Sequence, residues 1–365
     1  MLNILIYHPA NQAAKDIEAF AEAYIHKGNN VYLLTHSEKG ILHDCISNLG
    51  GKVFSVNKFS RFYYLNQIIY LIKFCRNNDI DVVYSNLQQC SIIAIFSQYF
   101  IKSKVITWRH HSDSVYFFGT WKEKIIDKLI NSLSKSIIVI SNFSYSQIVN
   151  FEKVKASKVN LIHLGYNFDC FPKTSNLNIN QIKNQYSARL LLVIVGRLIP
   201  LKRVNLAIET IEYLVTSGYD VKLMVLGTGE LEQSLKKMIT QKRLLNNVFL
   251  IGHVNNVQDY VGAADLLIHT SNSEASCHMP KEAGVLSKPV LVCENVGDFS
   301  DYIIDGFNGI VIDKNNTQQE LTTKLIEVYN KKIDINKLGK ELKKTVEKRF
   351  DINEIIKLHQ DLIIK

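Results

Sequence analysis

The chain has 365 residues, of which 47% are hydrophobic and 21% are charged, and this balance excludes a disordered protein. The length exceeds that of one typical core, so we expect two domains. The net charge of +9 is concentrated in the segment 1–165, which holds 18 Lys and Arg against 11 Asp and Glu. A basic surface of this kind favours anionic membranes or phosphorylated ligands as partners.

Short apolar runs alternate with amphipathic segments along the whole chain. In residues 13–28, Ile17, Phe20 and Tyr24 fall at helical spacing, and Gly28 is suited to end the helix. Strands that alternate with helices predict parallel sheets covered on both faces. The predicted strands span residues 2–8, 30–36, 52–56, 81–86, 104–110, 136–141, 160–165, 189–198, 221–227, 247–253, 265–271, 288–294 and 309–313.

A polar, asparagine-rich stretch at residues 166–190 separates the two sets of strands. We therefore expect an α/β fold with two doubly wound, Rossmann-like domains, residues 1–170 and 171–345, followed by a helical segment, residues 346–365. In such folds, ligands bind at the C-terminal ends of the strands, here in a cleft between the domains. Asp351 is suited to cap the last helix.

The compartment is predicted from what the sequence lacks. No apolar run reaches the roughly 18 residues that span a bilayer, and residues 1–10 predict a strand instead of a leader. The six cysteines form no C-x-x-C pair and no zinc-ligand spacing, which is typical of reduced, cytoplasmic thiols. No nucleic-acid module or aromatic–basic repeat is present, so no nucleic-acid partner is expected.

Basic residues and glycines follow the strands of the second half. Gly196, Arg197 and Lys202 lie between a strand and a helix, where cations beside a helix N-terminus suit an anion such as a diphosphate. The alternative is that Lys202 and the adjacent Arg203 are solvated loop charges. Gly227 and Gly229 form a G-x-G that lacks the third glycine of a dinucleotide fingerprint, so a tight turn and a ligand-facing loop are equal alternatives.

Gly252, His253 and Val254 follow the next strand. His253 can be catalytic, but a loop residue is the favoured interpretation, with the local backbone lining a base pocket.

The stretch "SEASCHMPKEAG" carries two glutamates eight positions apart, Glu274 and Glu282. Pro280 is suited to the first position of a helix, which would place Glu282 in the first turn. An acidic residue there stabilises a helix by about 0.3–1 kcal/mol, and this is the simple explanation. Alternatively, one carboxylate binds ribose hydroxyls and the other contacts a sugar, since carboxylates accept hydrogen bonds from vicinal diols.

In the first half, His110 and His111 end a strand and are the best acid/base or positioning candidates, with a surface histidine pair as the alternative. Adjacent histidines cannot easily both face one cleft. Asp79 and Asp81 form a D-x-D pattern, and a cap before the next strand explains it better than a metal site does.

An ordered series of motifs across residues 137–350 resembles the donor domain of retaining GT-B glycosyltransferases, the glycosyltransferase group 1 (family 4) set. The series is "VGRLIPLKR", "LMVLGTGEL", "FLIGHV", "DLLIHTSNSEASCHMPKEAGVLSKPVLVCENVGDF" and "DGFNGIVI", and its E-x7-E element falls on Glu274 and Glu282. The resemblance implies a GT-B fold with a C-terminal helix that packs back toward the first domain.

The resemblance also implies an activity. It is transfer of a sugar from a nucleotide-sugar donor to a glycan or lipid-linked acceptor, with retention, in bacterial surface polysaccharide biosynthesis. No metal and no cofactor is expected, and membrane attachment at the inner face of the cell membrane would suit a lipid-linked acceptor. Fixed cations and helix N–H groups can stabilise the leaving diphosphate without a metal.

Residue roles follow from the same resemblance. Arg197 and Lys202 would hold the donor diphosphate, Glu282 would bind the ribose, and Glu274 would lie near the transferred sugar. Residues 252–254 would line the base. The helix that starts near Met279 and Pro280 would lie near sugar and phosphates, and His110 or His111 would match the acceptor-domain histidine.

Two departures from the family pattern bear on function. The loop after the first strand, "HPANQAAKD", has no glycine, and Cys277 and His278 interrupt a usually apolar run between the glutamates. Two other functions stay open: a sugar-nucleotide epimerase of the same architecture, and a non-catalytic, degenerate transferase that acts as a binding module.

Overall fold

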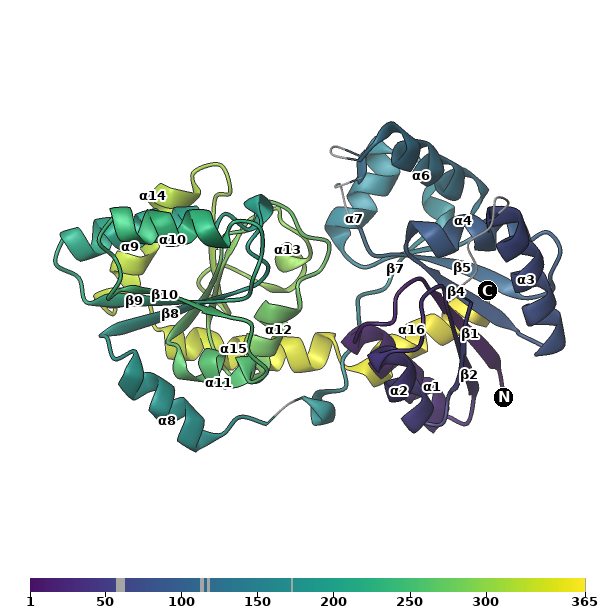
Figure 1. Ribbon diagram of the computed structural model, residues 1–365, viewed down its shortest axis with the longest axis horizontal. Coiled ribbons are helices and arrows are strands. Elements are labelled where there is room, and N and C mark those ends of the chain that lie inside the picture. The colour runs from purple at the N-terminus through teal and green to yellow at the C-terminus, as the bar shows by residue number, and fades with distance from the viewer. Residues whose placement is uncertain (57–62, 112–114, 117–118, 172, 365) are drawn as a thin grey trace. The chain divides into compact units, whose positions relative to one another are not determined.

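The computed structural model describes residues 1–365 except 57–62, 112–114, 117–118, 172 and 365. The chain forms two compact units, Met1–Asn167 with Phe350–Lys365 (unit 1) and Phe168–Arg349 (unit 2). In each unit, helices cover a parallel sheet, which confirms the α/β, doubly wound prediction (Figure 1). Among the described helices, none combines the length and apolarity needed to cross a bilayer.

Unit 1 is built on a seven-stranded parallel sheet of order β3-β2-β1-β4-β5-β6-β7. Its strands are β1 (Asn3–His8), β2 (Asn30–Thr35), β3 (Lys52–Ser55), β4 (Val82–Asn86), β5 (Lys104–Arg109), β6 (Ile137–Val139) and β7 (Val159–Leu161). Its helices include α1 (Lys15–His26), α2 (Ile41–Asn48), α3 (Tyr63–Asn77), α4 (Leu87–Ser97), α6 (Trp121–Leu133), α7 (Asn142–Ser146) and α16 (Ile352–Ile364), and the helical turn η1 (Gln147–Phe151) follows α7.

Helix α1 shows how the sequence pattern forms this unit. Asp16 and Glu18 lie in its first turn, where they complement the helix dipole, and Phe20 and Tyr24 on its apolar face are buried. Gly28 follows with φ of +79°, the left-handed conformation that commonly ends a helix. The predicted helix and its glycine terminator are therefore confirmed.

Helix α16 belongs to the core of unit 1, although it comes last in the sequence. The fully buried ring of His359 packs at 5.0, 5.5 and 5.3 Å from the rings of Phe20, Tyr84 and Trp108. The backbone of Tyr166 bonds to Phe350 and Ile352 on either side of Asp351. Figure 1 shows this yellow helix among the purple and blue elements of unit 1, so the predicted return of the C-terminal helix is confirmed.

Unit 2 is built on a six-stranded parallel sheet of order β10-β9-β8-β11-β12-β13. Its strands are β8 (Leu190–Val195), β9 (Val221–Leu226), β10 (Val248–Gly252), β11 (Leu266–His269), β12 (Val290–Cys293) and β13 (Ile310–Ile312). Its helices include α8 (Asn176–Gln185), α9 (Val204–Thr216), α10 (Glu232–Gln241), α11 (Val257–Ala263), α12 (His278–Val285), α13 (Phe299–Tyr302), α14 (Thr317–Tyr329) and α15 (Ile335–Arg349). Every strand predicted from the sequence is present.

The strand orders locate the candidate binding edges. In unit 1 the order reverses between β1 and β4, and in unit 2 it reverses between β8 and β11. In open parallel sheets, ligands bind beyond the carboxyl ends of the strands at such a switch point. The loops that follow β1, β4, β8 and β11 are therefore where each unit is expected to hold its ligand.

Candidate functional site

The loops after β8 and β9 are packed together by glycine. Gly227 has φ of +122°, and a Cβ atom there would lie 2.0 Å from the carbonyl oxygen of Gly196. The amide of Gly227 also donates to the carbonyl of Gly252 at 2.7 Å. A Cβ atom at Gly229 would lie 2.4 Å from the carbonyl oxygen of Leu198. These contacts make the G-x-G a close-packed turn that sets the shape of the β8 loop.

Arg203 fixes the conformation of the loop between β8 and α9 through hydrogen bonds from its side chain to neighbouring loops. Its guanidinium donates to the carbonyls of Thr270 and Lys314, both at 2.7 Å, and its backbone is left-handed, with φ of +50°. The hydroxyl of Thr270 donates back to the carbonyl of Lys202 at 2.8 Å. The alternative of a solvated charge is therefore wrong for Arg203, which joins the loops on both sides of the switch point.

Lys202, Glu274 and His269 form a charged cluster at this switch point. The ammonium of Lys202 is paired with Oε1 of Glu274, and Nε2 of His269 lies 3.3 Å from the same oxygen. Nε2 of His269 also lies 3.3 Å from the sulfur of Cys277. The cluster joins the end of β11, the loop before α12 and the loop after β8, so residues far apart in sequence meet at one edge of the sheet.

The cluster controls the ionisation of its members. Burial alone would raise the pKa of Glu274, but the hydrogen bond and charge of His269 and the charge of Lys202 lower this pKa to about 2. Burial alone would lower the pKa of His269, but Cys277 and Glu274 raise it to about 9. Glu274 is therefore a carboxylate and His269 an imidazolium at neutral pH.

Glu282 lies deeper than the sequence suggests. Helix α12 begins at His278, so Pro280 is its third residue and Glu282 its fifth, and the first turn holds no acidic residue. The predictions that Pro280 opens the helix and that Glu282 lies in its first turn are wrong. Proline is tolerated at the third position because the first four N–H groups of a helix have no intrahelical partner. Glu282 is 4% exposed and accepts a hydrogen bond from the amide of Gln258 at 3.1 Å.

A buried ion pair holds the start of α12 against the loop before α13. The ammonium of Lys281 donates to Asp298 at 2.5 Å, to Ser276 at 2.9 Å and to the carbonyl of Cys277 at 3.0 Å. Lys281 and Asp298 are 0% and 1% exposed. Next to them, a Cβ atom at Gly297 would lie 2.8 Å from Cβ of Glu274. The pair thus fixes the backbone around Glu274, a role for which the sequence spacing carried no signal.

The remaining candidates of unit 2 lie nearer the surface. Arg197 is exposed, and within the described residues no carboxylate pairs with it. His253 is an exposed loop residue, Val254 and Met279 are half-buried, and Gly252 has φ of +82° at a bulge beside β9. Arg197 is therefore a cation that a ligand can reach, whereas no hydrogen bond from another described residue positions His253 as an acid or base.

One group of side chains can be considered as a metal site. His269, Glu274 and Cys277 bring one ligand atom each within 4.8 Å of one another, the single such group found in the described part of the chain. The ammonium of Lys202 already compensates the Glu274 carboxylate, so a cation would compete with it. Asp81 accepts a hydrogen bond from the amide of Asn3 at 2.7 Å, which agrees with a structural role for this aspartate.

In unit 1, His110 lies at the switch point. Its Nε2 is 2.8 Å from the side-chain oxygen of Asn86 at the end of β4, and its Nδ1 is 3.8 Å from Asp16 at the start of α1. His8 ends β1 beside it, and burial followed by the charge of His110 lowers the pKa of His8 to about 4. His8 was not predicted, although its place at the end of β1 was a usable signal.

His111 points to a different part of unit 1. Its Nε2 lies 3.2 Å from Asp127 of α6, which also receives a hydrogen bond from Arg109 at 3.1 Å. Arg109 is 4% exposed and binds both oxygens of Glu152, at 2.7 and 2.8 Å. The two histidines thus have separate partners, as expected for neighbours that cannot face the same way, and His110 is the one at the switch point.

Comparison with known proteins places both units in described families. A family model for "Glycosyl transferases group 1" matches residues 176–348, and a model for "Glycosyltransferase Family 4" matches residues 13–169. The structure of Anabaena Alr3699/HepE in complex with UDP superposes with a TM-score of 0.85 at 17% identity, covering 99% of both chains. At that identity the superposition shows a shared fold, and the predicted GT-B architecture is confirmed.

Curated relatives match over part of their length. The poly(ribitol-phosphate) alpha-N-acetylglucosaminyltransferase of Staphylococcus aureus is 27% identical over 162 residues, which are 44% of this chain and 33% of that protein. The capsular polysaccharide biosynthesis glycosyltransferase CapM of Staphylococcus aureus is 24% identical over 234 residues, which are 62% of this chain and 60% of CapM. The chain therefore spans between a third and three fifths of these relatives.

Proposed function

Because the chain belongs to the group 1 glycosyltransferases of GT-B fold, we propose that it transfers a sugar from a nucleotide-sugar donor to a glycan or lipid-linked acceptor. The relatives named above act on poly(ribitol phosphate) or in capsule synthesis, which supports assembly of a bacterial surface polysaccharide. The observation that carries the proposal is the Lys202–Glu274–His269 cluster at the β8/β11 switch point of unit 2.

The donor would bind to unit 2. Arg197 and Lys202 supply positive charge for the diphosphate, and the N-terminus of α12, with Met279 and Pro280 in its first turn, adds oriented backbone dipoles. Glu282 accepts hydrogen bonds from ribose hydroxyls, and Glu274, held as a carboxylate, accepts from hydroxyls of the transferred sugar. The loop of Gly252, His253 and Val254 lines the base.

The chemistry would consist of stabilising the leaving group. Cleavage of the sugar–phosphate bond develops negative charge on the diphosphate, and preorganised cations lower the barrier because they need no rearrangement during the reaction. His269 keeps Glu274 ionised and oriented without contacting the phosphates itself. We propose that transfer proceeds with retention and without a metal ion or cofactor, since Lys202 and Arg197 supply the compensating charge.

In unit 1, His110 is proposed as the residue that acts beside the reacting sugar, because it lies at the switch point with Asn86 and His8. The protein is proposed to work in the cytoplasm, at the inner face of the cell membrane. The excess of basic residues in the segment 1–165 supports attraction to anionic lipid.

Incubation of the pure protein with a panel of nucleotide sugars and candidate acceptors tests the proposal. Release of nucleoside diphosphate with a new glycosidic bond is expected, with the donor's anomeric configuration by NMR and unchanged rate in EDTA. Reversible epimerisation of a donor would instead favour the epimerase. Binding without turnover of every donor would favour a binding module, which the glycine-free loop after β1 made worth considering.

A further inference from the structure

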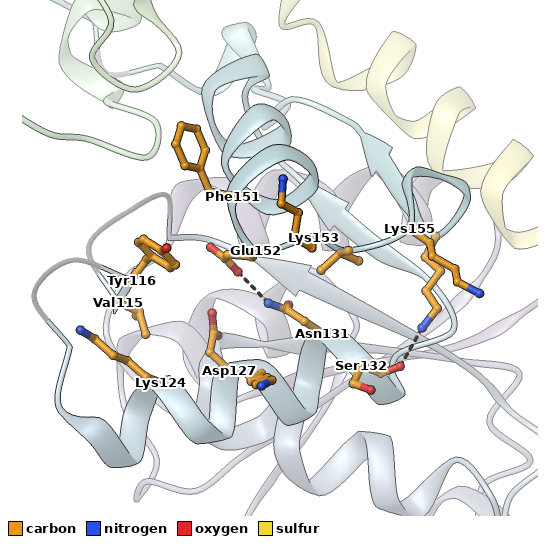
Figure 2. Close-up of a pocket in the computed structure, with 13 residues that line it drawn as sticks. Val115, Tyr116, Lys124, Asp127, Asn131, Ser132, Phe151, Glu152, Lys153 and Lys155 are labelled. Carbon is orange, nitrogen blue, oxygen red and sulfur yellow. Dashed lines mark hydrogen bonds between the residues drawn. The ribbon is translucent and has the colours of Figure 1, made fainter.

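A large pocket opens in unit 1 between α6 and the segment from Phe151 to Lys158 that leads into β7. Its volume is about 1070 Å³, which exceeds the typical cavity for one small ligand. Figure 2 shows α6 along one wall and the Phe151–Lys155 segment along the other. None of the residues predicted from sequence lines this pocket.

Lysines dominate the lining of this pocket. Lys124 and Lys128 come from α6, and Lys153, Lys155 and Lys158 come from the opposite wall. The ammonium of Lys158 donates to the carbonyl of Ser132 at 2.7 Å, and no ion pair is found for any of the five within the described ranges. Like charges gathered around one cavity repel each other, so an anionic occupant would be favoured.

The two carboxylates of the pocket cancel only a small part of this charge, because five lysines line the pocket and Arg109, which contacts both carboxylates, offsets one of their two negative charges. It binds Glu152 through two hydrogen bonds and Asp127 through one. The side chains of Arg109, Asp127 and Glu152 are 3%, 8% and 9% exposed. Asn131 adds a hydrogen bond to Glu152 at 2.7 Å, drawn across the floor in Figure 2. The floor is therefore a rigid, polar network below a cationic rim.

The polar floor and the lysine rim together suit a ligand that carries both hydroxyl and phosphate groups. Carboxylate and amide oxygens on the floor can accept hydrogen bonds from hydroxyl groups, and the lysines can bind phosphate oxygens. The exposed ring of Phe151 at the mouth offers an apolar face for a sugar ring. A hollow site with polar acceptors suits a hydroxyl-rich chain better than a lipid surface, for which an apolar, protruding patch would be expected.

We propose that this pocket binds a phosphate-bearing, polyhydroxylated part of the acceptor. The inference rests on the proposed function, and it names the acceptor class as a glycan or polyol chain that carries phosphate groups. Asp127 connects the pocket to the end of β5, because it contacts His111 directly, and His110 immediately precedes His111 in the chain. The phosphate can belong to a phosphodiester-linked polymer or to a lipid-linked glycan, since both present the same group.

Binding measurements with pocket and control variants test this assignment. The pocket variant is Lys128→Gln with Lys155→Gln, one lysine from each wall. The control is Lys73→Gln with Lys122→Gln, which removes the same charge from exposed positions of unit 1 outside the pocket. The probes are a glycerol-phosphate oligomer, farnesyl diphosphate, a neutral oligosaccharide, and phosphatidylcholine vesicles with and without phosphatidylglycerol. Thermal melting of both variants reports on folding.

Affinity for the glycerol-phosphate oligomer should fall about tenfold in the pocket variant and stay at the wild-type value in the control. Wild-type binding should also weaken as salt is added. A preference for the oligomer over farnesyl diphosphate would identify a phosphodiester polymer as the source of the phosphate, and the reverse preference would identify the diphosphate of a lipid carrier. The proposal would be overturned by an equal loss of affinity in both variants. It would also be overturned if the protein bound only the neutral oligosaccharide or only the anionic vesicles.

Donor turnover, measured in parallel, separates this inference from the proposed function. Wild-type protein that releases nucleoside diphosphate but binds no phosphate-bearing probe would refute the pocket assignment and leave the transferase intact. Absence of turnover with every donor would refute the proposed function, whatever the pocket binds.

Discussion

At the scale of single residues, the two glutamates of the E-x7-E element have different surroundings. Glu274 is paired with a lysine and a histidine, whereas Glu282 is buried on α12 beside Gln258. A helix-dipole role no longer explains Glu282, because it lies beyond the first turn of α12. A buried carboxylate can still accept hydrogen bonds from a ligand hydroxyl.

Substitution of Lys202 or Glu282 should weaken donor binding. Lys202→Ala removes a charge-assisted contact to phosphate, and Glu282→Ala removes a hydrogen-bond acceptor, so each should lower donor affinity about tenfold or more. Calorimetry with the active nucleotide sugar measures this, with Lys236→Ala on the surface of α10 as the control. Unchanged affinity in Glu282→Ala would remove this residue from the donor site.

His269 should make stability depend on pH. Its pKa is raised from 6.5 to about 9 in the folded protein, so the stabilisation is fully present below pH 6.5 and is lost as the pH rises toward 9. Urea unfolding across this range should therefore show a loss of stability that is smaller in His269→Gln. The same slope in both proteins would show that His269 is not protonated in this way.

The two histidines after β5 should differ in their effect on turnover. His110→Ala should lower kcat about 100-fold, the range of positioned acid–base groups, while His111→Ala should lower it less, because His111 contacts Asp127 away from the switch point. Changing both should resemble His110→Ala alone. A larger loss in His111→Ala would reverse the assignment.

At the scale of elements, α12 is held in place by a buried ion pair as well as by the packing of its apolar face. The Lys281–Asp298 pair joins its first turn to the residue before α13, and Gly297 lets that loop approach Glu274 closely. Sequence patterns predicted α12 but not this contact, because a lysine and an aspartate 17 positions apart carry no periodic signal.

Breaking this buried pair on one side should be strongly destabilising. Lys281→Met leaves Asp298 buried without its counter-charge, which costs about 3–5 kcal/mol of unfolding free energy. The double variant Lys281→Met with Asp298→Leu should recover part of that loss, whereas Lys344→Met, which breaks an exposed pair, should cost less than about 1 kcal/mol. Chemical unfolding gives all three values, and a harmless Lys281→Met would show that the pair is not what fixes α12.

At the scale of the whole molecule, the distribution of charge predicts a surface interaction. The segment 1–165 carries 18 Lys and Arg against 11 Asp and Glu. Sedimentation with anionic vesicles should show weak binding at low salt that disappears as salt screens the charges. Neutral vesicles are the control, and absence of binding at low salt would contradict the prediction.

The positions of the strands along the chain and the family motifs could be predicted from the sequence, because both depend on local patterns. Apolar runs predicted the positions of the strands. Polar and charged residues directly after those runs were then predicted as site candidates at the strand ends. Four features could not be predicted: the hydrogen bonds by which Arg203 joins two loops, the burial of Glu282, the pairing of Lys281 with Asp298, and the lysine-lined pocket. Each of them depends on which distant loops meet, and a single sequence does not encode that in its spacing.

The place of α16 has a consequence for how the chain is made. Residues 352–364 supply His359 to the core of unit 1, but they are synthesised after the whole of unit 2. Since chains emerge from the ribosome N-terminus first, unit 2 can complete its sheet while unit 1 still lacks a core helix. Unit 1 therefore begins first and is finished last, and a chain that lacks residues 350–365 would carry a complete unit 2 attached to a unit 1 without its last helix.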